Sequence, residues 1–123
     1  AQALRDADPM VRAEAAKSLG FLGEPAASAA GSLGDALRDP EVPVRREAAK
    51  ALVRLGRGAE AALKALVGAL EDKDKTVRSQ AARALGKIGS PAREAVPRLT
   101  ALSRDSDVLV SREAKGALEA IGP

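Results

Sequence analysis

The chain has 123 residues, a length that suits one compact domain or a short repeat array. Hydrophobic residues make up 46% of it and aromatic residues only 1%, so the core must be built from Ala, Leu, Val and Ile, which favours closely packed helices. The net charge is +3, and the sequence contains neither Cys nor His, which excludes disulfides, thiolate nucleophiles and histidine-based catalysis or metal binding.

The sequence repeats itself with a period of 33 residues. Val11-Arg12 recurs as Val44-Arg45 and as Val77-Arg78. The same step links three further series, which are Ala15, Ala48, Ala81 and Ala114; Leu19, Leu52, Leu85 and Leu118; and Gly23, Gly56, Gly89 and Gly122. This divides the chain into repeats at about 1–23, 24–56, 57–89 and 90–123. We expect them to form a single domain that is a fragment of a longer protein.

Each full repeat predicts two helices, and the segment 1–5 matches only the last turn of a first helix. The later half of a repeat carries one apolar helical stripe and then a Gly suited to ending a helix, as in Val44, Ala48, Leu52, Leu55 and Gly56. The earlier half also has helical spacing, and Pro97 within it predicts a bend. About 3.5 hairpins with seven helices follow, and they must stack, because no hairpin alone can bury its stripe.

The motif Asp, turn, Val-Arg-x-x-Ala-Ala-x-x-Leu-x-x-Leu-Gly runs from Asp39 to Gly56, and Asp72 to Gly89 repeats it with Ile88 at the last apolar position. The Trp and Tyr of tetratricopeptide repeats and the Thr-Pro-Leu-His of ankyrin repeats are absent. The motif resembles the short HEAT-like repeat, including the variety found in phycobilisome-lyase-related proteins. This resemblance implies an all-α, right-handed solenoid of stacked antiparallel hairpins that serves as a non-catalytic, cofactor-free scaffold for protein binding.

Acidic residues mark the turn within each repeat. In HEAT-like proteins such an Asp pairs with the Arg that opens the following helix, and the resemblance assigns this ladder to Asp6 with Arg12, Asp39 with Arg45, and Asp72 with Arg78. In the last repeat Asp105 would face Ser111, and Arg112 is one position later. The Asp-x-Asp spacing of the turns also begins calcium loops, but the other ligands are absent, so we predict helix caps.

A row of cations is predicted on the exposed side of the second helices. The resemblance places this side on the concave surface, where the row becomes a candidate binding stripe made of Lys17, Arg46, Lys50, Arg54, Arg83, Lys87 and Arg112. The expected partner is a protein, and an acidic one would complement the stripe. The alternative is an ordinary solvated face, because Glu14, Glu47, Gln80 and Glu113 lie beside these cations.

Two other functions remain open at this point. HEAT-like DNA-repair glycosylases show that such a fold can hold a duplex, although Phe21 is the one aromatic residue here and stacking platforms need several. Likeness to bilin-lyase-related repeats suggests a chaperone or lyase component. No apolar run approaches the ~18 residues that a membrane span needs, and we expect a cytoplasmic monomer.

Overall fold

The computed structural model describes residues 2–21 and 26–123, without the side chains of Gln2 and Ala26. Gly23 of the repeat series, and the boundary between the first two repeats, lie outside the described residues. The described part is helical and contains no strand. Its α-helices are α1 (Pro9–Leu19), α2 (Ala26–Ala36), α3 (Val42–Leu55), α4 (Leu63–Ala69), α5 (Lys75–Ile88), α6 (Val96–Leu102) and α7 (Val108–Ile121).

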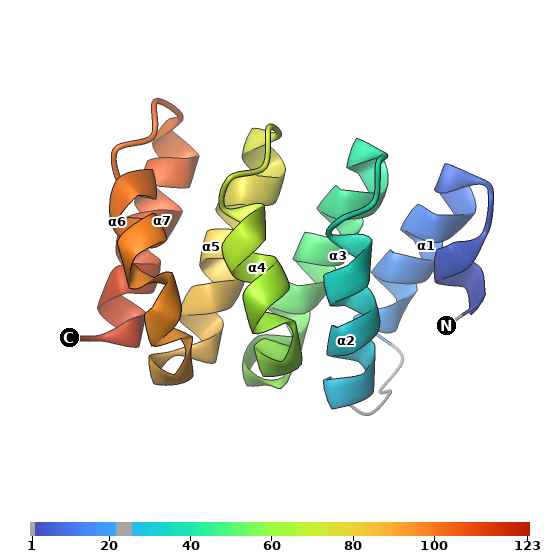
Figure 1. Ribbon diagram of the computed structural model, residues 1–123, viewed down its shortest axis with the longest axis horizontal. Helices are drawn as coiled ribbons and strands as arrows, with labels where there is room; N and C mark the ends of the chain where they lie inside the picture. Colours follow the sequence, from blue (N-terminus) through green and yellow to red (C-terminus); the bar gives the residue numbers. More distant parts are fainter. Residues whose placement is uncertain (1, 22–25) are drawn as a thin grey trace.

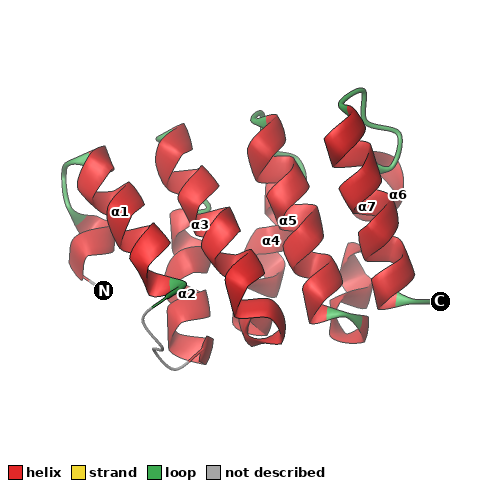
Figure 2. Cartoon of the chain, turned by 180° about the vertical axis from the view of Figure 1, so that it is seen from behind, coloured by secondary structure: helices red, strands yellow, loops and turns green. Residues whose placement is uncertain are grey.

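The helices form two layers that run along the array. In Figure 1 the helices α2, α4 and α6 lie in front, and α1, α3, α5 and α7 lie behind them. Figure 2 shows the second layer from its own side, with the four helices side by side. This is the predicted solenoid of stacked hairpins. Three 3₁₀ segments complete the described helices, namely η1 (Gln2–Arg5), η2 (Gly56–Ala62) and η3 (Ser90–Ala95).

The second helices α3, α5 and α7 end before Gly56, Gly89 and Gly122 as predicted, whereas α1 already ends at Leu19, before Gly20. Asp8, Asp74 and Asp107 cap α1, α5 and α7, each accepting a hydrogen bond from a backbone N–H of the first turn, whereas Glu41 makes no such bond before α3. At the other end Gly89 has φ 80° and ψ −146°, a region that only Gly adopts without strain. The capping role predicted for the turn acids is therefore confirmed for three of the four repeats.

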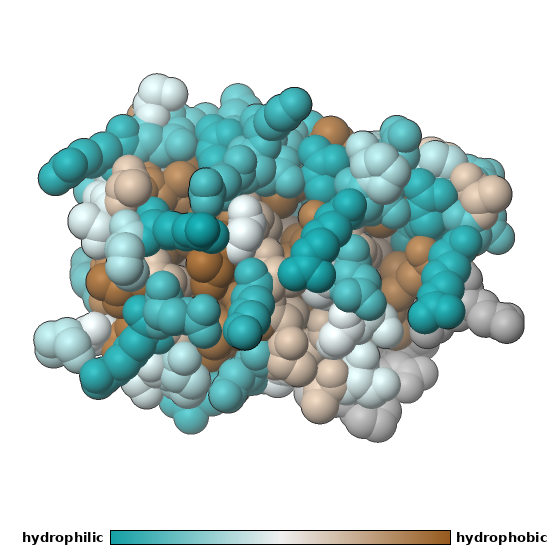
Figure 3. All heavy atoms as spheres, in the orientation of Figure 1, coloured by the Kyte–Doolittle hydropathy of each residue, from teal (hydrophilic) through white to brown (hydrophobic). Residues whose placement is uncertain are grey.

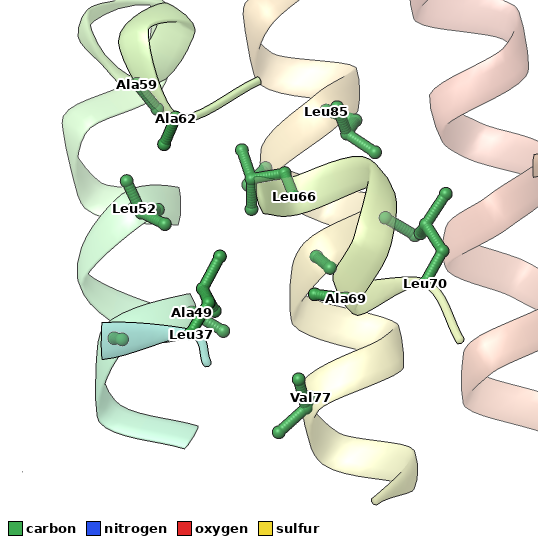
Figure 4. Packing of buried hydrophobic residues seen from close by; sticks show 14 of the residues in the cluster. Leu37, Ala49, Leu52, Ala59, Ala62, Leu66, Ala69, Leu70, Val77 and Leu85 are labelled. Atoms are coloured by element: carbon green, nitrogen blue, oxygen red, sulfur yellow. The ribbon is translucent and has the colours of Figure 1, made fainter. Parts of the chain in front are cut away.

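The core is built from small and branched aliphatic residues. Leu52 of α3, Leu66 of α4 and Leu85 of α5 are all 0% exposed and belong to one cluster (Figure 4). Leu19 is 8% exposed, which confirms the predicted buried series, and only Leu118 at its end is half-buried. Because Ala fills most positions between the two layers, the helices pack closely with little side-chain volume.

The predicted bend of the first helices is present in two repeats. Segment η3 changes to α6 immediately before Pro97, and Ala92 within η3 departs from helical geometry at φ −89° and ψ 22°. However, η2 changes to α4 at the corresponding place, where Lys64 stands instead of a proline. In the second repeat α2 is continuous from Ala26 to Ala36. Pro97 therefore fits the break in its helix but is not required for one, because the preceding repeat breaks at the same position with Lys64.

Within the described ranges, the longest helices are too short and too polar to cross a lipid bilayer.

Candidate functional site

Arginine residues link consecutive repeats on the turn side of the array. Arg12 Nε lies 2.8 Å from Asp39 Oδ2, and Arg45 Nε lies 2.8 Å from Asp72 Oδ2. The third rung is looser, with 3.2 Å between Arg78 Nε and Asp105 Oδ2. The side chains in these pairs are only 10–19% exposed, so the pairs are partly shielded from water. The ladder therefore ties each repeat to the next one.

The pairing expected from the sequence is wrong, because the carboxylates of Asp39 and Asp72 reach the arginine of the preceding repeat and not that of their own. Within its own repeat, Arg45 Nη1 donates to the backbone carbonyl of Asp39 at 2.9 Å. The Asp39 carboxylate accepts the backbone N–H of Glu41 at 2.9 Å, and this bond fixes its direction toward Arg12. In the same way Arg12 donates to the carbonyl of Asp6, and Arg78 to that of Asp72.

The two ends of the ladder differ. Asp105, whose rung the sequence left open between Ser111 and Arg112, pairs with Arg78. Ser111 donates instead to the carbonyl of Ser103 at 2.8 Å, and Arg112 has no ion pair with the described residues. Asp6 at the other end accepts the backbone N–H of Asp8 but no arginine of the described ranges. Asp6 and Asp72 thus each accept a backbone N–H within their own turn, and only Asp72 also pairs with an arginine of the preceding repeat.

Replacing Asp72 with Ala is expected to destabilise the chain more than replacing Asp6 with Ala. Both changes remove the turn bond, but only the first leaves the guanidinium of Arg45 without its carboxylate. The difference in unfolding free energy, measured by urea denaturation, should be about 1–3 kcal/mol. Equal losses would mean that the ladder pairs add nothing beyond the turn bond.

A second inter-repeat link involves Arg46, one of the predicted stripe residues. Its Nη2 and Nε lie 2.6 and 3.0 Å from the two carboxylate oxygens of Asp74. The equivalent positions in the first and third repeats are Ala13 and Ser79, which are 8% and 2% exposed. This repeat position therefore faces the neighbouring repeat, and Arg46 is occupied in that contact. Arg46 and Arg112 share this repeat position, and both are predicted stripe residues.

Two of the carboxylates that these arginines bind, those of Asp39 and Asp74, have lowered pKa values. Burial raises the pKa of Asp39, but the hydrogen bonds from Arg12 and from the amide of Glu41, with the charges of Arg12 and Arg45, outweigh it. The hydrogen bonds from Arg46 are the main cause that lowers the pKa of Asp74, against an opposing effect of burial. Both groups are thus more acidic in the folded chain.

Acid should weaken the fold through these two groups. A depressed folded pKa contributes stability that is present above the unfolded value of about 3.9 and is lost as the pH falls through the folded value. We expect the unfolding free energy to decline below about pH 4. In Asp74→Asn, urea denaturation at each pH should show a lower plateau and a shallower decline, and an unchanged slope would remove Asp74 from this role.

The remaining predicted cations form two adjacent rows on the exposed face of α1, α3 and α5. Lys17, Lys50 and Arg83 share one repeat position. Arg54 and Lys87 share a second repeat position, one helical turn further along the same helices. Arg54 lies 4.2 Å over the ring of Phe21, which is 64% exposed. Lys50 Nζ lies 3.8 Å from Glu47, an exposed contact of little energetic weight. We call Lys17, Lys50, Arg54, Arg83 and Lys87 the basic rows.

Acidic residues lie beside the basic rows, as the alternative reading of the sequence required. Glu14, Glu47 and Glu113 occupy one repeat position, with Gln80 between them. Among the described residues, Lys50 of the basic rows forms an ion pair with Glu47, whereas Arg83 and Lys87 form no ion pair. The face is therefore mixed in charge along the helices, and its cations are only partly neutralised.

A groove of about 300 Å³ opens on this face between α5 and α7. The helices approach closely there, since a Cβ built at Gly86 would lie 3.0 Å from the Cα of Ala117. The groove is lined by Arg83, Gly86, Lys87, Glu113, Gly116, Ala117 and Ala120. The groove is not among the sites predicted from the sequence, although one signal for it is present, because Gly116 and Ala120 stand where the previous repeat has Arg83 and Lys87.

The opposite face offers a different surface, which Figure 3 shows. Apolar atoms are visible there between α4 and α6, where Leu70, Ala101 and Leu102 line a groove of about 380 Å³. Arg98 Nε and Glu71 Oε2, 3.3 Å apart, pair at that groove. Its charges are thus balanced internally, in contrast to Arg83 and Lys87.

Comparison with known proteins places this geometry among helical repeat proteins. The family model described as HEAT repeats matches residues 30–121. No curated protein matches the chain significantly. Among solved structures, an engineered protein is similar at 29% identity with a TM-score of 0.80, over 98% of this chain and 60% of that chain.

Two further structures carry information about binding. A designed armadillo repeat protein in complex with the peptide (KR)4 is similar at 26% identity with a TM-score of 0.83, over 98% of this chain and 62% of that one. The complex of CpcE and CpcF of phycocyanin lyase from Nostoc sp. PCC7120 is similar at 30% identity and a TM-score of 0.78, over 98% of this chain and 51% of that one. The chain thus spans between half and two thirds of the length of these three proteins.

Proposed function

Because the chain belongs to the HEAT-repeat family, whose fold is typical of non-catalytic interaction scaffolds, we propose that it binds an acidic segment of a protein partner on the face of α1, α3, α5 and α7. The observation that supports this proposal is the pair of basic rows, of which Arg83 and Lys87 have no ion pair with the described residues. The HEAT resemblance implies that this layer lines the concave side. We also propose that residues 1–123 act as one monomeric repeat domain.

Charge complementarity favours an extended acidic peptide. The designed armadillo repeat protein is similar in fold, and its structure holds a peptide of alternating Lys and Arg. On the present chain the exposed face carries cations along two rows, the same charge as that peptide, so the complementary segment is acidic. Complementary charges raise both the association rate and the specificity of binding. The acidic position at Glu14, Glu47 and Glu113 would confine the segment to the end of the helices where the cations lie.

A charge-reversal pair of variants tests the proposal. In the face variant, Lys50, Arg54, Arg83 and Lys87 become Glu; in the control, Lys64, Lys73, Arg93 and Arg104 become Glu, which changes the net charge equally at exposed positions elsewhere. The probe is a labelled peptide of alternating Glu and Ser, followed by fluorescence anisotropy at about 0.15 M salt, where charges beyond about 8 Å are screened.

We expect the face variant to lose at least about tenfold in affinity, which corresponds to ~1.4 kcal/mol, and the control to change little. An equal loss in both variants would reduce the binding to non-specific attraction by net charge. A labelled DNA duplex that binds more tightly than the peptide, with a steep decrease in salt, would favour the nucleic-acid function instead.

The likeness to the phycocyanin-lyase complex supports a second candidate, a chaperone or lyase component that handles a bilin. This chain has no Cys or His, so it would hold the chromophore without covalent thiol chemistry. Absorbance titration of a free linear tetrapyrrole with the chain tests this, and a saturable spectral shift is the supporting result. An unchanged spectrum at excess protein would remove the candidate.

A further inference from the structure

The groove between α5 and α7 is lined by smaller residues than the equivalent positions of the preceding step of the array. Between α3 and α5, the two repeat positions on the α5 side carry the long side chains of Arg83 and Lys87. On α7 the same positions hold Gly116 and Ala120, which leave the space beside Ala117 open. The basic rows therefore end at a depression, and the α5 cations line one wall of it.

The groove combines two chemistries. Gly86, Gly116, Ala117 and Ala120 give it an apolar floor without long side chains, and Arg83 and Lys87 give it one cationic wall. Glu113 lies on the α7 side and would repel a carboxylate placed there. A volume of about 300 Å³ lies at the lower end of the range of ligand pockets, roughly 300–1,000 Å³, which leaves room for one large side chain.

We propose that this groove seats one large aliphatic side chain of the acidic partner segment, whose neighbouring carboxylates contact Arg83 and Lys87. The inference rests on the proposed function and adds to it a fixed register, since Gly116 and Ala120 occupy two repeat positions that carry long or aromatic side chains in the other repeats. The acidic residues lie on the α5 side of the anchor, because Glu113 disfavours them on the other side. The occupant is thus a segment with one Leu-like anchor within an acidic sequence.

Two matched peptides and two matched variants test the anchor. The probes are the labelled Glu-Ser peptide with a single central Leu and the same peptide with Gly at that place. The groove variant is Gly116→Leu, at an exposed helical position with no heavy atom within 4 Å of the added Cβ. Gly68→Leu is the control, since Gly68 is also exposed and open, but lies in α4 of the other layer.

On the unaltered chain, the Leu peptide should bind about five- to tenfold more tightly than the Gly peptide, as expected for partial burial of one Leu side chain. Gly116→Leu should abolish this preference and leave the affinity for the Gly peptide within about twofold, whereas Gly68→Leu should preserve the preference. Circular dichroism confirms that both variants are folded.

Three results would overturn the anchor. Equal affinity for the two peptides on the unaltered chain, or a preference that survives Gly116→Leu, contradicts the groove while the acidic-segment function stands. A preference lost equally in Gly68→Leu assigns the effect to a general change in the fold. If neither peptide binds, the proposed function fails together with the anchor.

Discussion

Leu52→Ala is expected to reduce the unfolding free energy by about 2–5 kcal/mol, because it leaves a cavity that the rigid neighbours cannot fill. Leu52 is 0% exposed and lies in α3, between repeats on either side, within the cluster that also holds Leu66 and Leu85. About half of the residues in this cluster are Ala, which have no side-chain freedom to move into the space. Urea denaturation followed by circular dichroism measures the loss.

The matched control for this prediction is Leu109→Ala, at a position in α7 that is 49% exposed. It removes the same atoms but leaves no enclosed cavity, so we expect a loss below about 1 kcal/mol. A loss below about 1 kcal/mol for Leu52→Ala as well would show that the central repeats can collapse around the missing side chain. Because repeat stability is a sum of local and interface contributions, the melt should also become less cooperative.

The fold follows from local signals that every repeat carries. A helical stripe such as Val44, Ala48 and Leu52 depends only on positions within one helix, and the Gly at its end depends only on one backbone conformation. Because the stripes repeat at a step of 33 residues, each one is expected to be buried in the same way, against the hairpins on either side of it. For this reason the stacked hairpins, the core and the ends of α3, α5 and α7 could be predicted without a structure.

The partners of charged residues could not be predicted, because they lie in other repeats. The distance in sequence from Asp39 to Arg45 is short, yet the carboxylate binds Arg12 of the preceding repeat. Arg46 and Lys50 are one helical turn apart, and only the packing of α3 against α5 distinguishes a residue at the interface from one at the surface. A repeat pattern predicts where a residue lies within its own helix. Which residues of the next repeat it contacts depends on how the two hairpins are offset when they pack.

The groove depends on an even finer quantity, the distance between two helices at one point. Gly86 and Gly20 occupy the same repeat position and allow close approach, to Ala117 and Ala51 respectively, whereas Val53 fills that position in α3. The α5–α7 step therefore combines a tight contact at Gly86 with missing side chains at Gly116 and Ala120. No single residue in the sequence indicates this combination, since Gly86 or Gly116 alone would only weaken a helix and Ala120 alone would only favour one.

Gly86→Val should destabilise the chain by about 1–3 kcal/mol, because its Cβ would lie 3.0 Å from the Cα of Ala117 and the backbone of α7 must move away. The gain in helix propensity, at most about 1 kcal/mol over Gly, opposes this loss but is smaller than the cost of separating the helices. Gly116→Val, where no heavy atom lies within 4 Å of the added Cβ, is the control and should leave stability unchanged or slightly higher. Equal free energies for the two variants in urea would mean that the α5–α7 contact yields without cost. In that case the groove would be a compliant surface, and its preference for one large side chain would have to come from the peptide and not from a preformed site.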